Sequence, residues 1–162
     1  MVTLASKGGN VLVERPEGVS LVTWFTNGGD IYPGHFVTSI DMSDPDMNLP
    51  DAVTEIPYGV VIERKDGTAG SPDVAIADNT AIIVAPCGSG CVVLAQTITS
   101  RGALTPGLKL CTNGGGKIGA AFSFTDTLTS AMKKAITRIV GRSCEYDADV
   151  AATDYVQVRL CC

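Results

Sequence analysis

At 162 residues and 16.8 kDa, the chain has the length of one ordinary domain. Its net charge of −5 and pI of about 4.7 argue against nucleic acid as a partner, because binding to phosphates depends on clustered lysine and arginine. No apolar run approaches the roughly 18 residues that cross a bilayer, and the N-terminus shows no secretory signal, so we expect a soluble, cytoplasmically made protein with no membrane partner.

The surface composition favours self-association. Charged residues are 18% of the chain and the mean hydropathy is +0.24, which leaves few polar side chains to cover a free monomer. We therefore expect that other subunits bury part of the surface. The alternative is a monomer whose many glycines and alanines raise the mean hydropathy.

Short β-branched and aromatic runs, separated by glycine, proline and aspartate, predict an all-β fold, a small antiparallel β-barrel or sandwich with at most one short helix. Residues 1–20 are predicted to be an extended N-terminal arm with one short strand, and residues 21–162 a single β-barrel-like domain. The predicted strands occupy residues 21–26, 31–40, 58–64, 81–87, 91–98, 108–112, 117–124, 136–146 and 155–160. Residues 125–135 are either a short helix or a loop with one helical turn.

Residues 81–87 and 91–98 flank the turn Gly88-Ser89-Gly90 and predict a β-hairpin. If the hairpin closes there, Cys87 and Cys91 face each other within disulfide range. The sequence therefore predicts a candidate Cys87–Cys91 disulfide.

The remaining cysteines leave more alternatives open. Cys161 and Cys162 are adjacent and cannot easily bond each other, so they are candidate intersubunit thiols or partners for Cys111 or Cys144. Because we expect no export, the alternative for all six cysteines is that they stay reduced.

The segment 41–50 (DMSDPDMNLP) combines aspartates with prolines and is predicted to be a surface loop. Four carboxylates belong to it or follow it directly: Asp41, Asp44, Asp46 and Asp51. A solvated acidic loop is one interpretation and a weak calcium site is the other, but the EF-hand spacing is missing. We predict no resident metal and no cofactor.

The sequence shows no catalytic set. His35 is the only histidine, which excludes multi-histidine metal centres, and we expect it at the surface or rim of the fold. Ser89 lacks the strand-to-helix setting of a nucleophile elbow. The run Asn113–Lys117 lacks the spacing of a phosphate-binding loop and is predicted to be a hairpin turn. We therefore predict a non-enzymatic protein.

Two segments, Ile31–Val37 and Leu104–Leu110, share a Pro-Gly pair that suits the centre of a type II turn. Each turn is predicted to lead into a barrel strand. Two turns alone do not establish a repeat.

From residue 27 onward, the order of motifs resembles that of small head decoration proteins, also described as capsid cement or capsid-fibre proteins, of tailed phages and prophages. The elements that carry the resemblance are Gly29-Asp30-Ile31-Tyr32-Pro33-Gly34, Gly59-Val60-Val61, the Ala81–Leu94 region, Pro106-Gly107-Leu108, Gly116-Lys117-Ile118, Val140-Gly141-Arg142 and Val156-Gln157-Val158-Arg159-Leu160. The six cysteines and the Asp41–Asp51 segment, which looks like an insertion, depart from the family pattern.

The resemblance implies a β-barrel protein that binds the outer surface of the major capsid protein lattice, often as a homotrimer, and stabilises the shell in the virion. Strand addition by the 1–20 arm is one way in which such a subunit could bind its neighbours. The alternative hypothesis is a carbohydrate- or host-surface-binding module, with Trp24, Tyr32 and Tyr58 as contact residues.

Overall fold

The computed structural model describes residues 10–28, 30–39, 46–50, 55–65, 74–97, 103–112, 115–120, 139–146 and 155–161. Within these ranges the chain forms strands and no helix, which confirms the predicted all-β class. The strands are β1 (Leu12–Glu14), β2 (Val22–Thr26), β3 (Phe36–Ser39), β4 (Asp46–Asn48), β5 (Gly59–Arg64), β6 (Ala81–Pro86), β7 (Val92–Gln96), β8 (Lys109–Thr112), β9 (Ile118–Ala120), β10 (Ile139–Ser143) and β11 (Tyr155–Leu160). The predicted 125–135 helix or loop lies outside the described residues, and in the part that is described no helix could span a membrane.

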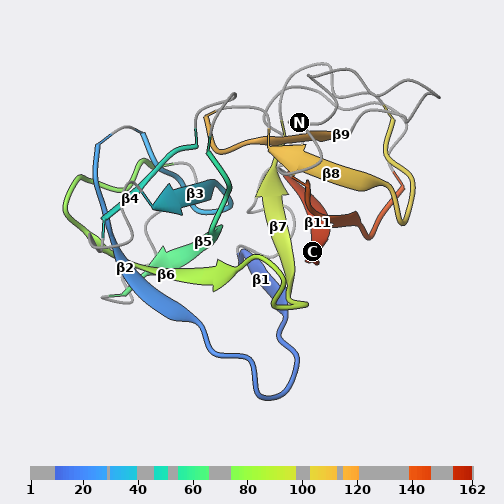
Figure 1. Ribbon diagram of the computed structural model, residues 1–162, viewed down its shortest axis with the longest axis horizontal. Helices are drawn as coiled ribbons and strands as arrows, with labels where there is room; N and C mark the ends of the chain where they lie inside the picture. Colours follow the sequence, from blue (N-terminus) through green and yellow to red (C-terminus); the bar gives the residue numbers. More distant parts are fainter. Residues whose placement is uncertain are drawn as a thin grey trace.

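The strands form two side-by-side units (Figure 1). Strands β2, β4, β3, β5 and β6 close into a barrel, which we call the first barrel. The other sheet has the order β1-β7-β11-β10-β8-β9, and we call its strands β7 to β11 the second barrel. A parallel bridge between Thr97 and Ile118 joins the end of β7 to β9, the last strand of this order.

The second barrel repeats the first strand for strand. In sequence order, β2 to β6 correspond to β7 to β11, and each pair of neighbours in the first barrel recurs in the second. The register agrees as well: Val22↔Val84 corresponds to Val93↔Val158, Val37↔Gly59 to Leu110↔Gly141, Gly59↔Pro86 to Gly141↔Leu160, Ser39↔Met47 to Thr112↔Ile118, and Thr26↔Met47 to Thr97↔Ile118. The fold is therefore a tandem repeat of one five-stranded unit.

The two Pro-Gly segments are equivalent positions of this repeat. The Tyr32 carbonyl accepts a hydrogen bond from the His35 N–H (3.1 Å), and the Thr105 carbonyl accepts one from the Leu108 N–H (3.0 Å). Gly34 has φ 86° and Gly107 has φ 85°, which is the conformation that glycine allows at the third position of a type II turn. Each turn leads into a strand, as the sequence predicts, and the resemblance between the two segments extends to a whole repeat.

Alternation along the strands of the first barrel sends side chains into two cores. Val37, Val61 and Val84 belong to the first barrel's own cluster of buried residues. Their neighbours Phe36, Val60 and Ala85 point the other way and join the larger cluster, which also contains residues of the second barrel. Because this core is shared, we propose that the two barrels unfold together, as the prediction of a single 21–162 domain requires.

The predicted hairpin of residues 81–87 and 91–98 is wrong. Strand β6 pairs with β2 and β5 in the first barrel, whereas β7 pairs with β1 and β11 in the second. The Gly90 N–H donates to the Leu160 carbonyl (2.8 Å), so the Gly-Ser-Gly turn carries the chain from one barrel to the other. A short glycine loop suits both a hairpin and a crossing of this kind, and local sequence does not distinguish them.

The prediction of a surface loop over residues 41–50 is wrong for its second half. Strand β4 (Asp46–Asn48) lies between β2 and β3, parallel to β2 and antiparallel to β3. Met47 is completely buried in the first barrel's core. The strand is only three residues long and contains no proline, so no backbone donor is missing from its ladder.

Gly59 and Gly141 occupy equivalent positions where two backbones approach closely. A Cβ on Gly59 would collide with the Ala85 carbonyl oxygen and lie 2.7 Å from Val84 Cγ1; a Cβ on Gly141 would collide with the Arg159 carbonyl oxygen and lie 2.7 Å from Val158 Cγ1. We predict that Gly59→Ala and Gly141→Ala each lower the unfolding free energy by about 3 kcal/mol, measured by urea denaturation.

Gly18→Ala is the control for this prediction, because a Cβ there would meet nothing within 4 Å and only the φ of 81° opposes it. We expect this variant to lose about 1 kcal/mol. Equal losses in all three variants would contradict the steric explanation.

Candidate functional site

The two barrels are joined by a short piece of the first barrel, residues Gly34–Phe36, which we call the wedge. The Gly34 carbonyl accepts a hydrogen bond from the N–H of Gln96 at the end of β7 (3.1 Å), and the Phe36 N–H donates to the carbonyl of Gly116, just before β9 (2.7 Å). The wedge therefore lies between two strands of the second barrel. In the first barrel the equivalent strands, β2 and β4, pair directly at Phe25↔Asp46.

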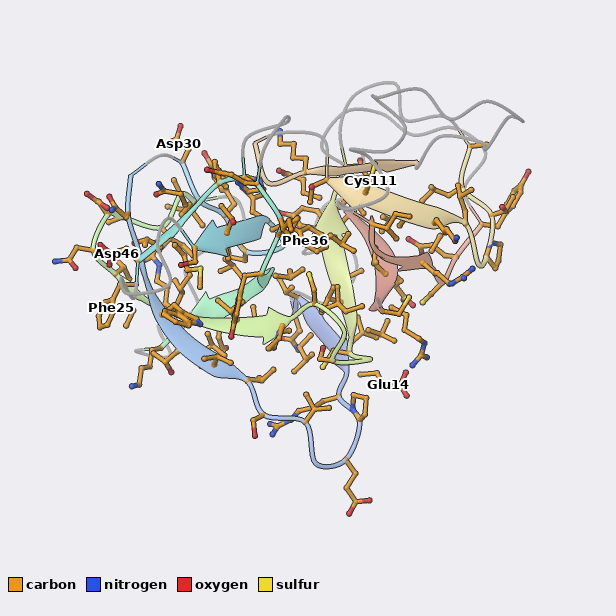
Figure 2. All side chains as sticks on the ribbon, in the orientation of Figure 1. Glu14, Phe25, Asp30, Phe36, Asp46 and Cys111 are labelled. Atoms are coloured by element: carbon orange, nitrogen blue, oxygen red, sulfur yellow. The ribbon has the colours of Figure 1, made fainter. Side chains whose placement is uncertain are left out.

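This insertion explains why the two barrels close differently. Thr97↔Ile118 is the bridge between β7 and β9 in the second barrel, and it is the equivalent of Thr26↔Met47 in the first. In the second barrel, the wedge occupies the place that the pair Phe25↔Asp46 has in the first barrel. Figure 2 shows Phe36 at the centre of the molecule, between the two sheets, where its side chain is fully buried in the larger core.

Gly34 makes the close approach at the wedge. A Cβ at this position would lie 2.7 Å from Tyr155 Cε1 and 2.9 Å from the Leu94 carbonyl oxygen. The Tyr155 hydroxyl donates a buried hydrogen bond to the Pro33 carbonyl (3.2 Å), which ties β11 to the same turn. Glycine is thus required at position 34 for two reasons: it allows the positive φ of the turn, and it leaves room for the second barrel to approach.

His35 lies inside the junction, and the prediction of a surface or rim position is wrong. Its side chain is 3% exposed, because the second barrel covers the turn that carries it. Nδ1 accepts a hydrogen bond from the Tyr32 N–H (3.4 Å), and Nε2 lies 2.5 Å from Gln96 Oε1. The neutral imidazole with its proton on Nε2 satisfies both contacts.

Burial is the main reason that the pKa of His35 falls from 6.5 to about 4. The hydrogen bond to Gln96 acts in the opposite direction, and the positive charge of Lys117 lowers the pKa further. The imidazole is therefore neutral at pH 7, where it positions the wedge against β7.

The predicted Cys87–Cys91 disulfide was based on a hairpin that the structure does not contain. Cys91 is buried, and its carbonyl accepts from the Leu160 N–H (2.8 Å), so its neighbour across the ladder is β11. Cys87 is half-buried at the end of β6, and its N–H donates to the Tyr58 carbonyl (2.8 Å). The hairpin that would have placed these two cysteines opposite each other is absent, and the candidate disulfide stays a prediction without that support.

Cys161 follows β11 and is half-buried, with its N–H donating to the Val140 carbonyl (3.3 Å). Cys162 lies outside the described residues. The candidate intersubunit role of both thiols stays a prediction. Cys111 is buried within β8, and Cys144 is half-buried just after β10.

The candidate acidic site is described only at Asp46, which accepts a hydrogen bond from Asn27 Nδ2 (3.3 Å). Asp41, Asp44 and Asp51 lie outside the described residues, as do residues 113 and 114 of the glycine run. Among the residues that the structure describes, no group of three or more His, Cys, Asp and Glu side chains could hold a metal ion. The calcium hypothesis stays untested.

The three aromatic residues of the carbohydrate hypothesis are half-buried. Trp24 and Tyr58 pack edge to face with ring centroids 5.6 Å apart, and Tyr32 packs against His35 at 5.3 Å. The Trp24 indole nitrogen is buried and has no hydrogen-bond partner among the described residues.

Sequence reasoning missed Gln96, Tyr155 and Gly116 as partners of the wedge. The repeated Pro-Gly turn was the one sequence signal at the wedge, and it marks the turn without identifying its partners. Nothing local to those three residues identifies their contacts.

Comparison with protein-family models and with curated proteins gives no match. Among solved structures, the chain is similar to a chain in the capsid of Myoviridae phage XM1, with a TM-score of 0.50 and 16% sequence identity over 93% of this chain and 91% of that chain. At this identity the likeness concerns the fold, and it includes both barrels.

Gly34 and Gly107 form a matched pair for testing the wedge. A Cβ on Gly107 meets nothing within 4 Å, while its φ is nearly the same as that of Gly34. We predict that Gly34→Ala lowers the unfolding free energy by about 2 kcal/mol more than Gly107→Ala does, because only Gly34 touches the other barrel. Urea denaturation measures both; equal losses would show that the wedge is not tightly packed.

The pH dependence of stability provides a second test. The pKa of His35 is lower in the folded state, so its contribution is fully present above pH 6.5 and is lost as the pH falls toward 4. We predict that acidification over this range lowers the unfolding free energy by up to about 3 kcal/mol more in the wild-type protein than in His35→Gln. Denaturation midpoints at several pH values measure this difference, and parallel curves would contradict it.

Proposed function

We propose that this protein is a virion structural protein, a capsid decoration or cement subunit that binds the outer surface of the major capsid protein lattice and stabilises the shell. The observation that carries the proposal is the likeness in fold, over nearly the whole of both chains, to a chain of a phage capsid. The motif order that resembles head decoration proteins supports it independently.

The chemistry of the surface fits a binding role. The low content of charged residues leaves apolar side chains exposed at Val13, Phe25, Ile56, Val74 and Tyr146. A subunit that binds only the assembled lattice shifts the assembly equilibrium toward the shell by mass action. We propose this non-enzymatic role, as a homotrimer on the capsid surface after assembly in the host cytoplasm.

The sequence suggested that the N-terminal arm adds a strand to neighbouring subunits, whereas its described strand pairs within the same chain. Strand β1 adds to the edge of β7 in the same chain, where the Leu94 N–H donates to the Val11 carbonyl (2.7 Å). Arg159 and Glu14 form an exposed ion pair across the same sheet (3.2 Å). Residues 11–14 of the arm therefore cover an edge of their own fold.

Binding to shells tests the proposal. Purified protein mixed with capsid shells that lack it should co-sediment with them to saturation, and the loaded shells should withstand higher temperature than bare shells. An acidic protein of similar size is the control for non-specific binding. Absence of co-sedimentation, combined with specific hits on a glycan array, would favour the carbohydrate-binding alternative.

A further inference from the structure

The turn that carries the wedge exists twice, but only its first copy is covered. Pro33 and Gly34 are buried between the barrels, whereas their equivalents Pro106 and Gly107 are exposed. The turn hydrogen bond and the glycine φ are the same in both copies. The second barrel thus carries residues 105–108 in the conformation of a wedge that, among the described residues, enters no other barrel.

The first barrel carries the corresponding acceptor position. In the second barrel, the wedge lies beside a retained bridge, Thr97↔Ile118. The first barrel has the equivalent of that bridge in Thr26↔Met47, and the place beside it is closed by the single pair Phe25↔Asp46. A wedge could therefore enter the margin between β2 and β4 at the expense of one cross-strand pair, together with the Asn27–Asp46 side-chain hydrogen bond (3.3 Å).

The wedge residue and the residue that it meets are both polar in the contact within the chain, and both of their equivalents are apolar. Within the chain, the wedge residue His35 meets Gln96, a polar pair that is buried and hydrogen-bonded. By the register of the repeat, the equivalents are Leu108 on the second turn and Phe25 on β2. Leu108 is half-buried and Phe25 is 39% exposed. Contact between them would bury apolar surface on both, in place of the hydrogen bond.

The two surfaces lie at opposite ends of the molecule. Figure 2 shows Phe25 pointing outward at the left margin, and Figure 1 shows β8, which follows the second turn, beginning on the right. In each barrel the acceptor strand, β2 or β7, lies to the left of the Pro-Gly turn that precedes β3 or β8. A surface and its complement at opposite ends produce a head-to-tail contact, which forms a ring if the rotation closes.

We propose that copies of this chain associate head to tail, with residues 105–108 of one copy inserted at the β2–β4 margin of the next and Leu108 packed against Phe25. The proposal deepens, and rests on, the self-association that forms part of the proposed function. It concerns the free protein and needs no capsid shell, so its failure is separate from a failure of shell binding.

Sedimentation velocity of the full chain over a concentration series tests the contact. We expect wild-type protein to form oligomers, and Phe25→Glu and Leu108→Glu each to weaken association by about tenfold or more. Ile56→Glu places the same charge on a side chain that is 67% exposed and outside the contact, and it should associate like wild type. Circular dichroism of each variant verifies that it is folded.

Mixing the two variants gives the decisive result. Phe25→Glu protein keeps an intact turn and Leu108→Glu protein keeps an intact acceptor, so an equimolar mixture should form one-to-one dimers and no larger species. A mixture that stays monomeric while wild type associates would overturn the proposed contact. Wild-type protein that remains monomeric at all concentrations, or two variants that associate like wild type, would overturn it too.

Discussion

The contact on which this architecture depends is the insertion of Gly34–Phe36 between the end of β7 and the start of β9. It pairs the Gln96 N–H and the Gly116 carbonyl of the second barrel with the Gly34 carbonyl and the Phe36 N–H of the first. The same insertion brings Phe36 into the shared core and His35 against Gln96. The relative placement of the barrels thus depends on backbone hydrogen bonds and a close glycine approach at the wedge, together with apolar burial in the shared core.

The two repeats have the same backbone fold, but few equivalent positions carry the same residue. The fold demands specific residues only where φ is positive, as at Gly34 and Gly107, or where two backbones nearly touch, as at Gly59 and Gly141. Elsewhere a strand position requires only a side chain of suitable polarity and size. Val61 and Ser143, for example, are equivalent and both buried, although one is apolar and the other hydroxylic. A repeat of this kind is visible in the register of its strands and nearly invisible in its sequence.

The sequence was sufficient for the fold class and for most strands, because period-two patterns and glycine turns are local signals. In β11, the buried Val156, Val158 and Leu160 alternate with Gln157 and Arg159 as predicted. The pairing of strands was not predictable, since β6 and β7 are neighbours in sequence but belong to different barrels. His35 was misplaced for the same reason: what buries it is the second barrel, more than sixty residues away at Gln96.

The differences between the two wedges follow from the kind of contact each can make. A buried polar pair such as His35 and Gln96 stabilises only the geometry in which both partners are satisfied, and it is costly in any other. That suits a joint formed once, during folding, within one chain. An apolar pair such as Leu108 and Phe25 tolerates small changes of geometry, and neither side chain leaves an unsatisfied group when it is exposed. That suits a contact made between molecules that have already folded, as in the proposed head-to-tail association.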